Sequence, residues 1–276
     1  MNKKLLGLYG LKFNPFSSQL PASALWNPPS IQSFCWRIEQ QIGEGGFALT
    51  LGDPGAGKSA ALRLLSEHLN GVRDLSVGTL TRPQAKMADF YRELGHLFGV
   101  ALSPSNRWCS SKALREKWLT HIEAALYRPV LIIDEAQEMN SLVLAELRLL
   151  ASADLDSRSI LTIILAGDQR LAGRLEEPDW LPVASRIRNR LRLDPWTPKQ
   201  LQECLNHLLK AAGNPRLLTS SLALTLCEHA AGNLRLLMNM ANELLSAASH
   251  QERDQIDEKL YFEVFALDPK SPAKHS

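Results

Sequence analysis

The sequence predicts an α/β protein in which a five-stranded parallel sheet is covered by helices and followed by a small all-α lid. Three observations indicate this. Short apolar runs alternate with segments of helical periodicity between residues 31 and 196. The first apolar run leads into a glycine-rich loop and then into a leucine-rich helical pattern. After Trp196 the strand signals stop, and only helical patterns follow.

The order of elements follows from these patterns. Val130 to Ile133 are four consecutive apolar residues, which is typical of a parallel strand buried on both faces. The expected strands are 47–51, 75–80, 130–133, 160–165 and 191–193. The expected helices of the α/β part are 31–42, 60–69, 86–98, 112–127, 141–151 and 183–190, with a polar loop over 103–111. Further helices are expected over 198–212, 220–231, 234–248 and 257–265, separated by glycine-containing stop signals.

These patterns divide the chain into four parts. We expect an ordered arm over residues 1–30, an α/β core over 31–196, the helical lid over 197–265 and a frayed tail over 266–276. The arm is rich in Pro, Gly and Asn, and its aromatic residues need a surface to pack against.

Composition is that of an ordinary globular protein. Of 276 residues, 45% are hydrophobic and 22% are charged, and the formal net charge is +2, so any basic footprint for nucleic acid must be local. The four cysteines are far apart and form no C-x-x-C pair, which favours reduced thiols over a zinc site. No apolar run approaches the ~20 residues of a membrane span, and no signal-peptide core follows the start. We therefore expect a soluble, cytoplasmic protein without a membrane partner.

The glycine-rich loop reads Gly-Asp-Pro-Gly-Ala-Gly-Lys-Ser and lies between a predicted strand and a predicted helix, which is the context of a phosphate-binding P-loop. Its backbone amides would surround phosphate oxygens, Lys58 would contact the terminal phosphates, and the Ser59 hydroxyl would reach Mg²⁺. A glycine-rich turn without a ligand is the alternative. The expected nucleotide-binding residues are Gly52, Asp53, Pro54, Gly55, Ala56, Gly57, Lys58, Ser59 and Ala60.

Carboxylates follow two of the expected strands. Asp134 is expected to hold Mg²⁺, and Glu135 is expected to act as the base that deprotonates the attacking water; alternatively, the pair caps the next helix. Asp168, after the fourth strand, would sense the γ-phosphate or simply cap the helix that follows it. A carboxylate there would repel phosphate unless Mg²⁺ or an arginine lay between them.

Arginines supply the remaining candidates. Arg186, Arg188 and Arg190 fall within the expected helix 183–190, where Arg186 and Arg190 would share a face. Such a residue can complete a neighbouring subunit's nucleotide site, although a solvated basic helix is the alternative for any one of them. Arg235, in a G-x-x-R sequence at the start of the helix 234–248, would face the core and contact the γ-phosphate.

The order of these parts resembles the AAA+ ATPase superfamily, with Gly52–Ser59 as Walker A, Val130–Glu135 as Walker B, Asp168 as sensor 1, Arg186 or a neighbour as arginine finger and Arg235 as sensor 2. The opening segment from Leu8 to Phe16 and the segment from Leu165 to Leu171 resemble the ExeA-like branch. That branch includes a secretion-associated ATPase and the transposition helper ATPases of the TniB, TnsC and Mu B type.

The resemblance implies hydrolysis of ATP with Mg²⁺ between subunits of a ring or filament of identical chains. For the transposition helpers it also implies partners, namely double-stranded DNA and a transposase, with DNA contacts here at Arg82, Lys86 and Arg107. Those three residues could equally be solvated surface charges. The alternative is a secretion-linked or protein-remodelling ATPase that acts without DNA. The secretion ATPases carry a membrane segment and a cell-wall-binding region that this sequence lacks, so we expect the first class.

Overall fold

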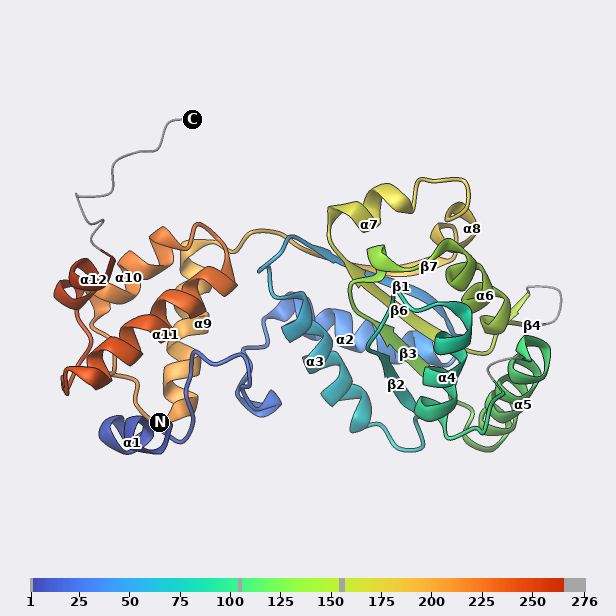
Figure 1. Ribbon diagram of the computed structural model, residues 1–276, viewed down its shortest axis with the longest axis horizontal. Coiled ribbons are helices and arrows are strands. Elements are labelled where there is room, and N and C mark those ends of the chain that lie inside the picture. The colour runs from blue at the N-terminus through green and yellow to red at the C-terminus, as the bar shows by residue number, and fades with distance from the viewer. Residues whose placement is uncertain (1, 104–105, 154–156, 266–276) are drawn as a thin grey trace. The chain divides into compact units, whose positions relative to one another are not determined.

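A computed structural model describes residues 2–103, 106–153 and 157–265 of the chain, which divides into two compact units (Figure 1). One unit is an α/β domain formed by residues 27–194. The other is helical and combines residues 1–26 with the chain from residue 195 onward. The tail over 266–276, for which the sequence predicted fraying, lies outside the described residues.

The α/β unit is built on a five-stranded parallel sheet, as the sequence predicted. Its strand order is β2–β3–β6–β1–β7. In chain order the strands are β1 (Gly46–Gly52), β2 (Val77–Leu80), β3 (Val130–Ile133), β6 (Thr162–Gly167) and β7 (Ile187–Leu193). A separate antiparallel pair joins β4 (Ser152–Ala153) to β5 (Arg158–Ser159).

The central strands carry the core. Every residue of β3 and β6 is buried, which agrees with the continuous apolar runs in the sequence. On one face, Leu49, Ile133 and Ile163 belong to a hydrophobic cluster that includes Phe90 and Trp118 from the covering helices. The intervening residues of each strand point to the opposite face, and α2 and α3 contact β1. Burial on both sides of β1, β3 and β6 holds their C-terminal ends in fixed positions.

The helices of this unit are α2 (Pro29–Ile42), α3 (Lys58–Asn70), α4 (Met87–Phe98), α5 (Arg107–Ala125), α6 (Ser141–Ala151), α7 (Gln169–Arg174) and α8 (Leu181–Ala184), with a 3₁₀ turn η2 (Ala136–Glu138). The predicted loop over 103–111 ends earlier than expected. Asn106 accepts a hydrogen bond from the backbone N–H of Cys109 at 3.0 Å and so begins α5 five residues before the predicted start at 112.

The predicted helix over 183–190 is wrong. α8 ends at Ala184, and the following residues form β7, the edge strand beside β1. From Ile187 to Leu193 exposure alternates with every residue, and Arg188 and Arg190 lie on the exposed side. The arginines at every second position therefore reflect the period of a strand, so Arg188 shares a face with Arg190. Arg186 lies between α8 and β7 rather than on a helix.

The helical unit contains α1 (Asn2–Tyr9), the 3₁₀ turn η1 (Ala22–Ala24), α9 (Pro198–Ala212), α10 (Ser220–His229), α11 (Leu234–His250) and α12 (Glu258–Phe265). The sequence did not predict α1. Tyr9 and Phe16 of the N-terminal segment are buried in one cluster with Leu205 and Leu244, so the arm is part of this unit's core. Thr197 and Gln200 form a capping box that begins α9.

Candidate nucleotide-binding site

The P-loop connects β1 to α3. Gly55 and Gly57 have φ angles of 88° and 96°, which only glycine adopts without strain. Gly57 precedes the first turn of α3 and has no side chain to cap it, so the N–H groups of that turn are left for an anion. A Cβ on Gly52 would lie 3.0 Å from the Leu193 Cβ. The sequence thus folds here into a loop whose amides are directed at one site.

Lys58 and Ser59 are the first two residues of α3. The Lys58 side chain is buried, and its Nζ donates to the Gly52 carbonyl at 2.8 Å and to the Asp53 carbonyl at 3.3 Å. The Ser59 hydroxyl donates to Oδ2 of Asp134 at 3.2 Å. The end of β3 therefore lies beside the start of α3, and the loop, the ammonium group and the first carboxylate converge.

The acidic pair lies at the end of β3. Asp134 also accepts a hydrogen bond from the backbone N–H of Glu135 at 2.9 Å. Glu135 itself has a left-handed backbone, with φ at 51°, and an exposed side chain. The side-chain amide of Gln137, which is buried, donates to Oε2 of Glu135. Gln137 therefore restrains the carboxylate that the sequence assigned as the base.

Asp168 follows the last residue of β6 and is buried. Its carboxylate accepts from the backbone N–H of Arg170 at 2.9 Å and so caps α7, which was one of the two expected roles. The Arg170 guanidinium contacts Asp168 and Glu138, each at 2.9 Å. The hydrogen bond from Arg170 holds the pKa of Asp168 below its usual value, and nearby Lys58 contributes in the same direction. The Arg170 guanidinium therefore neutralises the charge of Asp168.

A second arginine fixes the segment between Glu135 and α6. Arg174 of α7 donates to the backbone carbonyls of Gln137 and Met139, the latter at 2.8 Å. Its guanidinium lies over the Trp180 ring at 4.2 Å from the centroid, and the Trp180 N–H donates to Ser141 at 3.2 Å. Arg174 therefore holds in place the turn that carries Gln137.

The other candidate arginines contact other groups or belong to the other unit. Arg188 is paired with Glu44, and Arg186 donates to the Pro182 carbonyl. Within the described residues the side chain of Arg190 has no ion-pair partner. Arg235 is the exposed second residue of α11 and belongs to the helical unit. Their proposed contacts with phosphate groups stay predictions.

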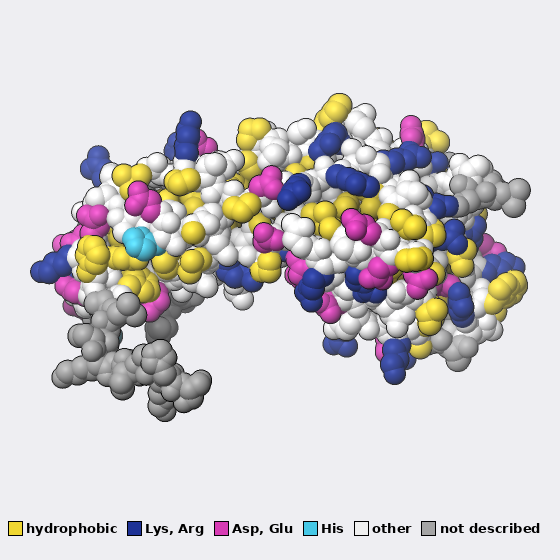
Figure 2. Space-filling view, turned by 90° about the horizontal axis from the view of Figure 1, so that it is seen from above, with side chains coloured by type: hydrophobic (Ala, Val, Ile, Leu, Met, Phe, Trp, Pro, Cys, Tyr) yellow, Lys and Arg dark blue, Asp and Glu magenta, His cyan; other side chains and the backbone are white. Residues whose placement is uncertain are grey.

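Two of the candidate DNA contacts, Arg82 and Lys86, are exposed in the segment between β2 and α4. Arg107 differs from them, because its guanidinium is paired with the buried carboxylate of Glu146, which also accepts from the Tyr91 hydroxyl. On the face of the molecule in Figure 2, dark-blue basic and magenta acidic side chains are interspersed. A DNA footprint on that face would therefore be local.

These residues fit a nucleotide with a magnesium ion. The glycine cradle and Lys58 suit the phosphates, since amides and an ammonium group both attract anions. The Ser59 hydroxyl and the Asp134 carboxylate are hard oxygen ligands that already lie within 3.2 Å of each other, as Mg²⁺ requires. Glu135, next along the chain, is exposed and held by Gln137, which suits a base for water.

A P-loop, an aspartate beside its serine and a glutamate just after the buried strand β3 define a P-loop ATPase. Residues 38–175, half of the chain, match the AAA domain family. The chain therefore belongs to that family and is an AAA+ ATPase.

Solved structures share the fold at low sequence identity. Cdc6p from Pyrobaculum aerophilum matches with a TM-score of 0.68 and 16% identity over 91% of this chain and 70% of that one. Drosophila ORC bound to DNA matches with a TM-score of 0.68 and 18% identity over 95% of this chain and 65% of that one. The RuvB Holliday junction branch migration motor of Thermotoga maritima matches with a TM-score of 0.61 and 16% identity over 91% of this chain and 72% of that one.

Among curated proteins, general secretion pathway protein A of Aeromonas hydrophila is 27% identical over 199 residues. The match covers 71% of this chain and 36% of that protein, so the chain spans about a third of the length of its relative. In the part of the chain that the structure describes, no helix combines the length and apolar composition needed to cross a membrane.

Sequence reasoning missed three residues that shape the site, namely Gln137, Arg170 and Arg174. Gln137 follows Glu135 by two residues, so its position after the acidic pair is a signal that could have found it. Arg170 follows Asp168 at the same spacing. Arg174 carries no local signal, because its partners Gln137 and Met139 belong to a different segment of the chain.

Proposed function

We propose that this ATPase hydrolyses ATP between adjoining copies of the chain and that the bound nucleotide switches it between assembled and dispersed states. The P-loop and Lys58 would hold the triphosphate, and Ser59 and Asp134 would hold Mg²⁺, which supplies charge neutralisation at the phosphates. Glu135 would accept a proton from the attacking water. The observation that supports the proposal is the 3.2 Å hydrogen bond from Ser59 to Asp134, because it joins the two proposed metal ligands beside the P-loop.

Three arginines and one aspartate would complete the reaction. Arg186 or Arg190 would reach the nucleotide of a neighbouring copy, and Arg235 would contact the γ-phosphate. The position of Arg190 on the exposed side of an edge strand supports this role. Asp168, neutralised by Arg170, would respond to the γ-phosphate through that arginine.

Two substitutions test the assignment. Lys58→Ala should abolish nucleotide binding or weaken it severely. Glu135→Gln should keep nucleotide binding but lower kcat by roughly 10²- to 10⁴-fold, because a general base contributes about that much, and should trap the assembled form. Binding is measured by titration with a fluorescent ATP analogue and assembly by sedimentation velocity. Hydrolysis by Glu135→Gln at the unaltered rate would show that another group is the base.

For the partner we propose double-stranded DNA, with the ATP-bound assembly recruiting a transposase to it. The exposed Arg82 and Lys86, which have no ion-pair partner among the described residues, support a backbone-directed contact. Solved structures with a similar fold include a protein bound to DNA and a branch migration motor, and this similarity is one of fold alone. Arg107 is the weaker candidate, because its guanidinium already neutralises Glu146.

Steady-state ATP hydrolysis with and without duplex DNA tests this partner. We expect stimulation that declines with salt and that disappears in the double variant Arg82→Ala with Lys86→Ala. Arg73→Ala is the matched control, because Arg73 has a side chain that is 95% exposed and lies outside this segment. Electron micrographs with ATP and DNA should show filaments or rings. Indifference to DNA in both assays would remove this partner.

A second candidate is a secretion-linked ATPase with a protein partner and no DNA. The similarity to general secretion pathway protein A favours it, within the matched third of that protein. Both candidates place the ATPase in the cytoplasm, where ATP is supplied. An ATPase rate that ignores DNA, together with ATP-dependent assembly that Glu135→Gln traps, would favour the second candidate while leaving the nucleotide switch intact.

A further inference from the structure

The end of β6 lies between the P-loop and the acidic pair. β6 is flanked by β3 and β1 in the sheet. Leu51, near the end of β1, pairs with Gly167. Ile133, the last residue of β3, pairs with Leu165. Because parallel strands end at the same edge of a sheet, the segment that begins with Asp168 starts between the phosphate loop and the end of β3.

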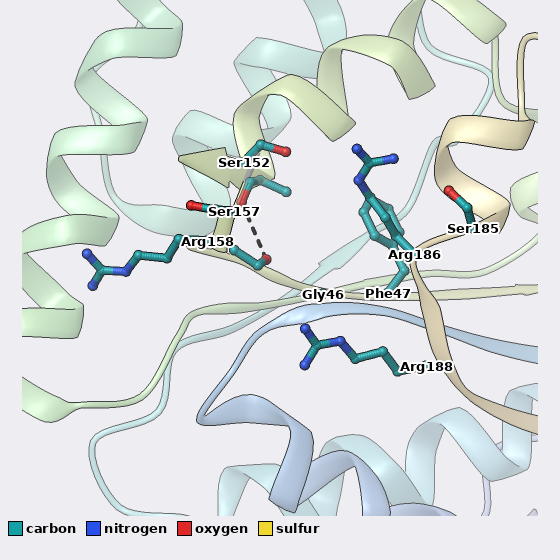
Figure 3. Close-up of a pocket in the computed structure, with 10 residues that line it drawn as sticks. Gly46, Phe47, Ser152, Ser157, Arg158, Ser185, Arg186 and Arg188 are labelled. Atoms are coloured by element: carbon teal, nitrogen blue, oxygen red, sulfur yellow. Dashed lines mark hydrogen bonds between the residues drawn. The ribbon is translucent and has the colours of Figure 1, made fainter. Parts of the chain in front are cut away.

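Two candidate arginines of the α/β unit lie far from the P-loop of their own chain. Figure 3 shows Arg186 and Arg188 beside the Gly46–Phe47 backbone, where β1 begins. The P-loop follows the other end of this strand, whose seven residues span about 20 Å at roughly 3.3 Å per residue. A single side chain does not reach across that distance. Within the α/β unit, an arginine that contacts the γ-phosphate of the same chain would therefore belong to another segment.

Arg170 of α7 is placed for such a contact. Its Nε donates to both carboxylate oxygens of Asp168, at 3.2 and 3.0 Å, and its Nη2 lies 2.9 Å from Oδ2. Its Nη1 lies 2.9 Å from Oε1 of Glu138, in the turn η2 after the acidic pair. Each terminal nitrogen of an arginine carries two N–H groups, so within the described part of the chain Arg170 keeps N–H groups available for an anion.

The two carboxylates hold Arg170 unequally. The Asp168 side chain is only 12% exposed and also accepts from the backbone N–H of Arg170, whereas the Glu138 side chain is 47% exposed. Ion pairs that water reaches contribute little, so the pair with Glu138 is the one that a phosphate group can replace. Arginine suits such an exchange because its planar guanidinium binds carboxylate and phosphate oxygens in the same paired geometry.

The charges around Asp168 indicate that the P-loop lysine is near. The pKa of Asp168 is lowered mainly by the hydrogen bond from Arg170, and the charge of Lys58 lowers it further. Lys58 is the residue proposed to contact the terminal phosphates. Asp168 and Arg170 therefore lie within electrostatic range of the group that would hold the same phosphates.

We infer that Arg170 contacts the γ-phosphate of ATP bound in the same chain, keeps its pair with Asp168 and gives up its pair with Glu138. The inference rests on the nucleotide site proposed above and adds a residue that distinguishes ATP from ADP. Because ADP has no γ-phosphate, the pair of Arg170 with Glu138 would persist in the ADP-bound chain. Glu138 belongs to the turn that carries Gln137, which donates to Glu135. The exchange would therefore report the triphosphate to the turn beside the proposed base.

The test compares the affinities of the full chain for ADP and for adenylyl imidodiphosphate, a triphosphate analogue that is not hydrolysed. Both are measured by displacement of a fluorescent ADP analogue with Mg²⁺ present. The protein concentration is one at which sedimentation velocity finds single chains, so no neighbouring copy supplies an arginine. Arg170→Gln should weaken binding of the triphosphate analogue by about tenfold or more, the scale of a hydrogen bond to a charged group, while ADP affinity stays close to that of the unaltered protein.

Two further variants separate this contact from a folding defect. Arg170→Lys keeps a cation beside Asp168 but lacks the paired N–H groups, so it should fold and still lose most of the preference for the triphosphate. Glu138→Gln removes the competing carboxylate and should strengthen triphosphate binding by about two- to fivefold, the scale of an exposed ion pair, with ADP affinity close to unaltered. In the double variant of Arg170→Gln with Glu138→Gln this gain should vanish, because both residues act through one contact.

Arg92→Gln is the matched control. Arg92 has a side chain that is 66% exposed and is paired with Asp89 on α4, much as Arg170 is 65% exposed and paired with Asp168. Its substitution should leave both affinities close to those of the unaltered protein. Thermal unfolding shows whether each variant is folded.

Several results would overturn the inference. Equal losses of ADP and triphosphate affinity in Arg170→Gln would show that Arg170 only links α7 to η2. Unaltered or weaker triphosphate binding by Glu138→Gln would show that no exchange takes place. A preference for the triphosphate that appears only when the chains assemble would assign the contact to a neighbouring copy. Each of these results leaves ADP binding by the unaltered protein intact, whereas loss of the P-loop site itself would abolish binding of both nucleotides.

Discussion

The hydrogen bond from Gln137 to Glu135 leads to the most specific prediction about turnover. Gln137 is buried, its backbone carbonyl accepts from Arg174, and its side-chain amide donates to the carboxylate of Glu135. Gly167 is required beside it, because a methyl group there would overlap the Gln137 side-chain oxygen. Gln137 is therefore a positioning residue for the base rather than a group that contacts the substrate.

Gln137→Met keeps most of the side-chain volume and removes the donor. A hydrogen bond to a charged group is worth about 1.5–3 kcal/mol, so loss of the orientation it provides should lower kcat by about ten- to a hundredfold. Gln137→Glu, which has almost the same shape, should lower kcat further because two carboxylates would then face each other. ATP affinity should stay close to that of the unaltered protein, since Gln137 is not among the P-loop residues.

Single-turnover hydrolysis and equilibrium ATP binding, measured separately, distinguish positioning from a general structural effect. Gln169→Met is the matched control, because Gln169 is a nearby but exposed glutamine at the start of α7. If Gln137→Met retained kcat within about twofold, the hydrogen bond would not orient the base. A parallel loss of ATP affinity and melting temperature would instead assign Gln137 a structural role.

Three further predictions concern the surrounding structure. Gly52→Ala should destabilise the protein by roughly 1–3 kcal/mol in urea unfolding, since the new methyl would lie 3.0 Å from Leu193, and an unchanged midpoint would contradict the packing. The pKa of Asp168 is lowered in the folded state, so the extra free energy of unfolding relative to Asp168→Asn should be full above the usual aspartate pKa and should be lost as the pH falls below it. If that difference in the free energy of unfolding instead grew towards about pH 3, the pairing with Arg170 would be refuted. A thiol reagent near neutral pH should label Cys109 in the folded protein and all four cysteines after denaturation. The other three, Cys35, Cys204 and Cys227, are buried, and burial raises their pKa values to about 11, 12 and 11. Rapid labelling of any of these three in the folded protein would show that its surroundings open.

The sequence was sufficient for features that depend on adjacent residues. The spacing within Gly52–Ser59, the run from Val130 to Ile133 with its terminal acidic pair and the Gly-Asn helix stops all act over a few residues. The motifs predicted that Ser59 and Asp134 both hold Mg²⁺, and in the structure the Ser59 hydroxyl donates to Asp134 at 3.2 Å.

Tertiary structure decided the features whose partners are distant in the chain or whose local pattern is ambiguous. The segment 183–190 follows both a helical and a strand period, and pairing with β1 selects the strand, because only there are its backbone groups satisfied beside an existing sheet. In the same way Arg174 acquires its role because folding brings α7 to the turn after β3. Local spacing therefore determined which residues can bind and cleave a nucleotide, whereas packing determined which side chains hold those residues in place.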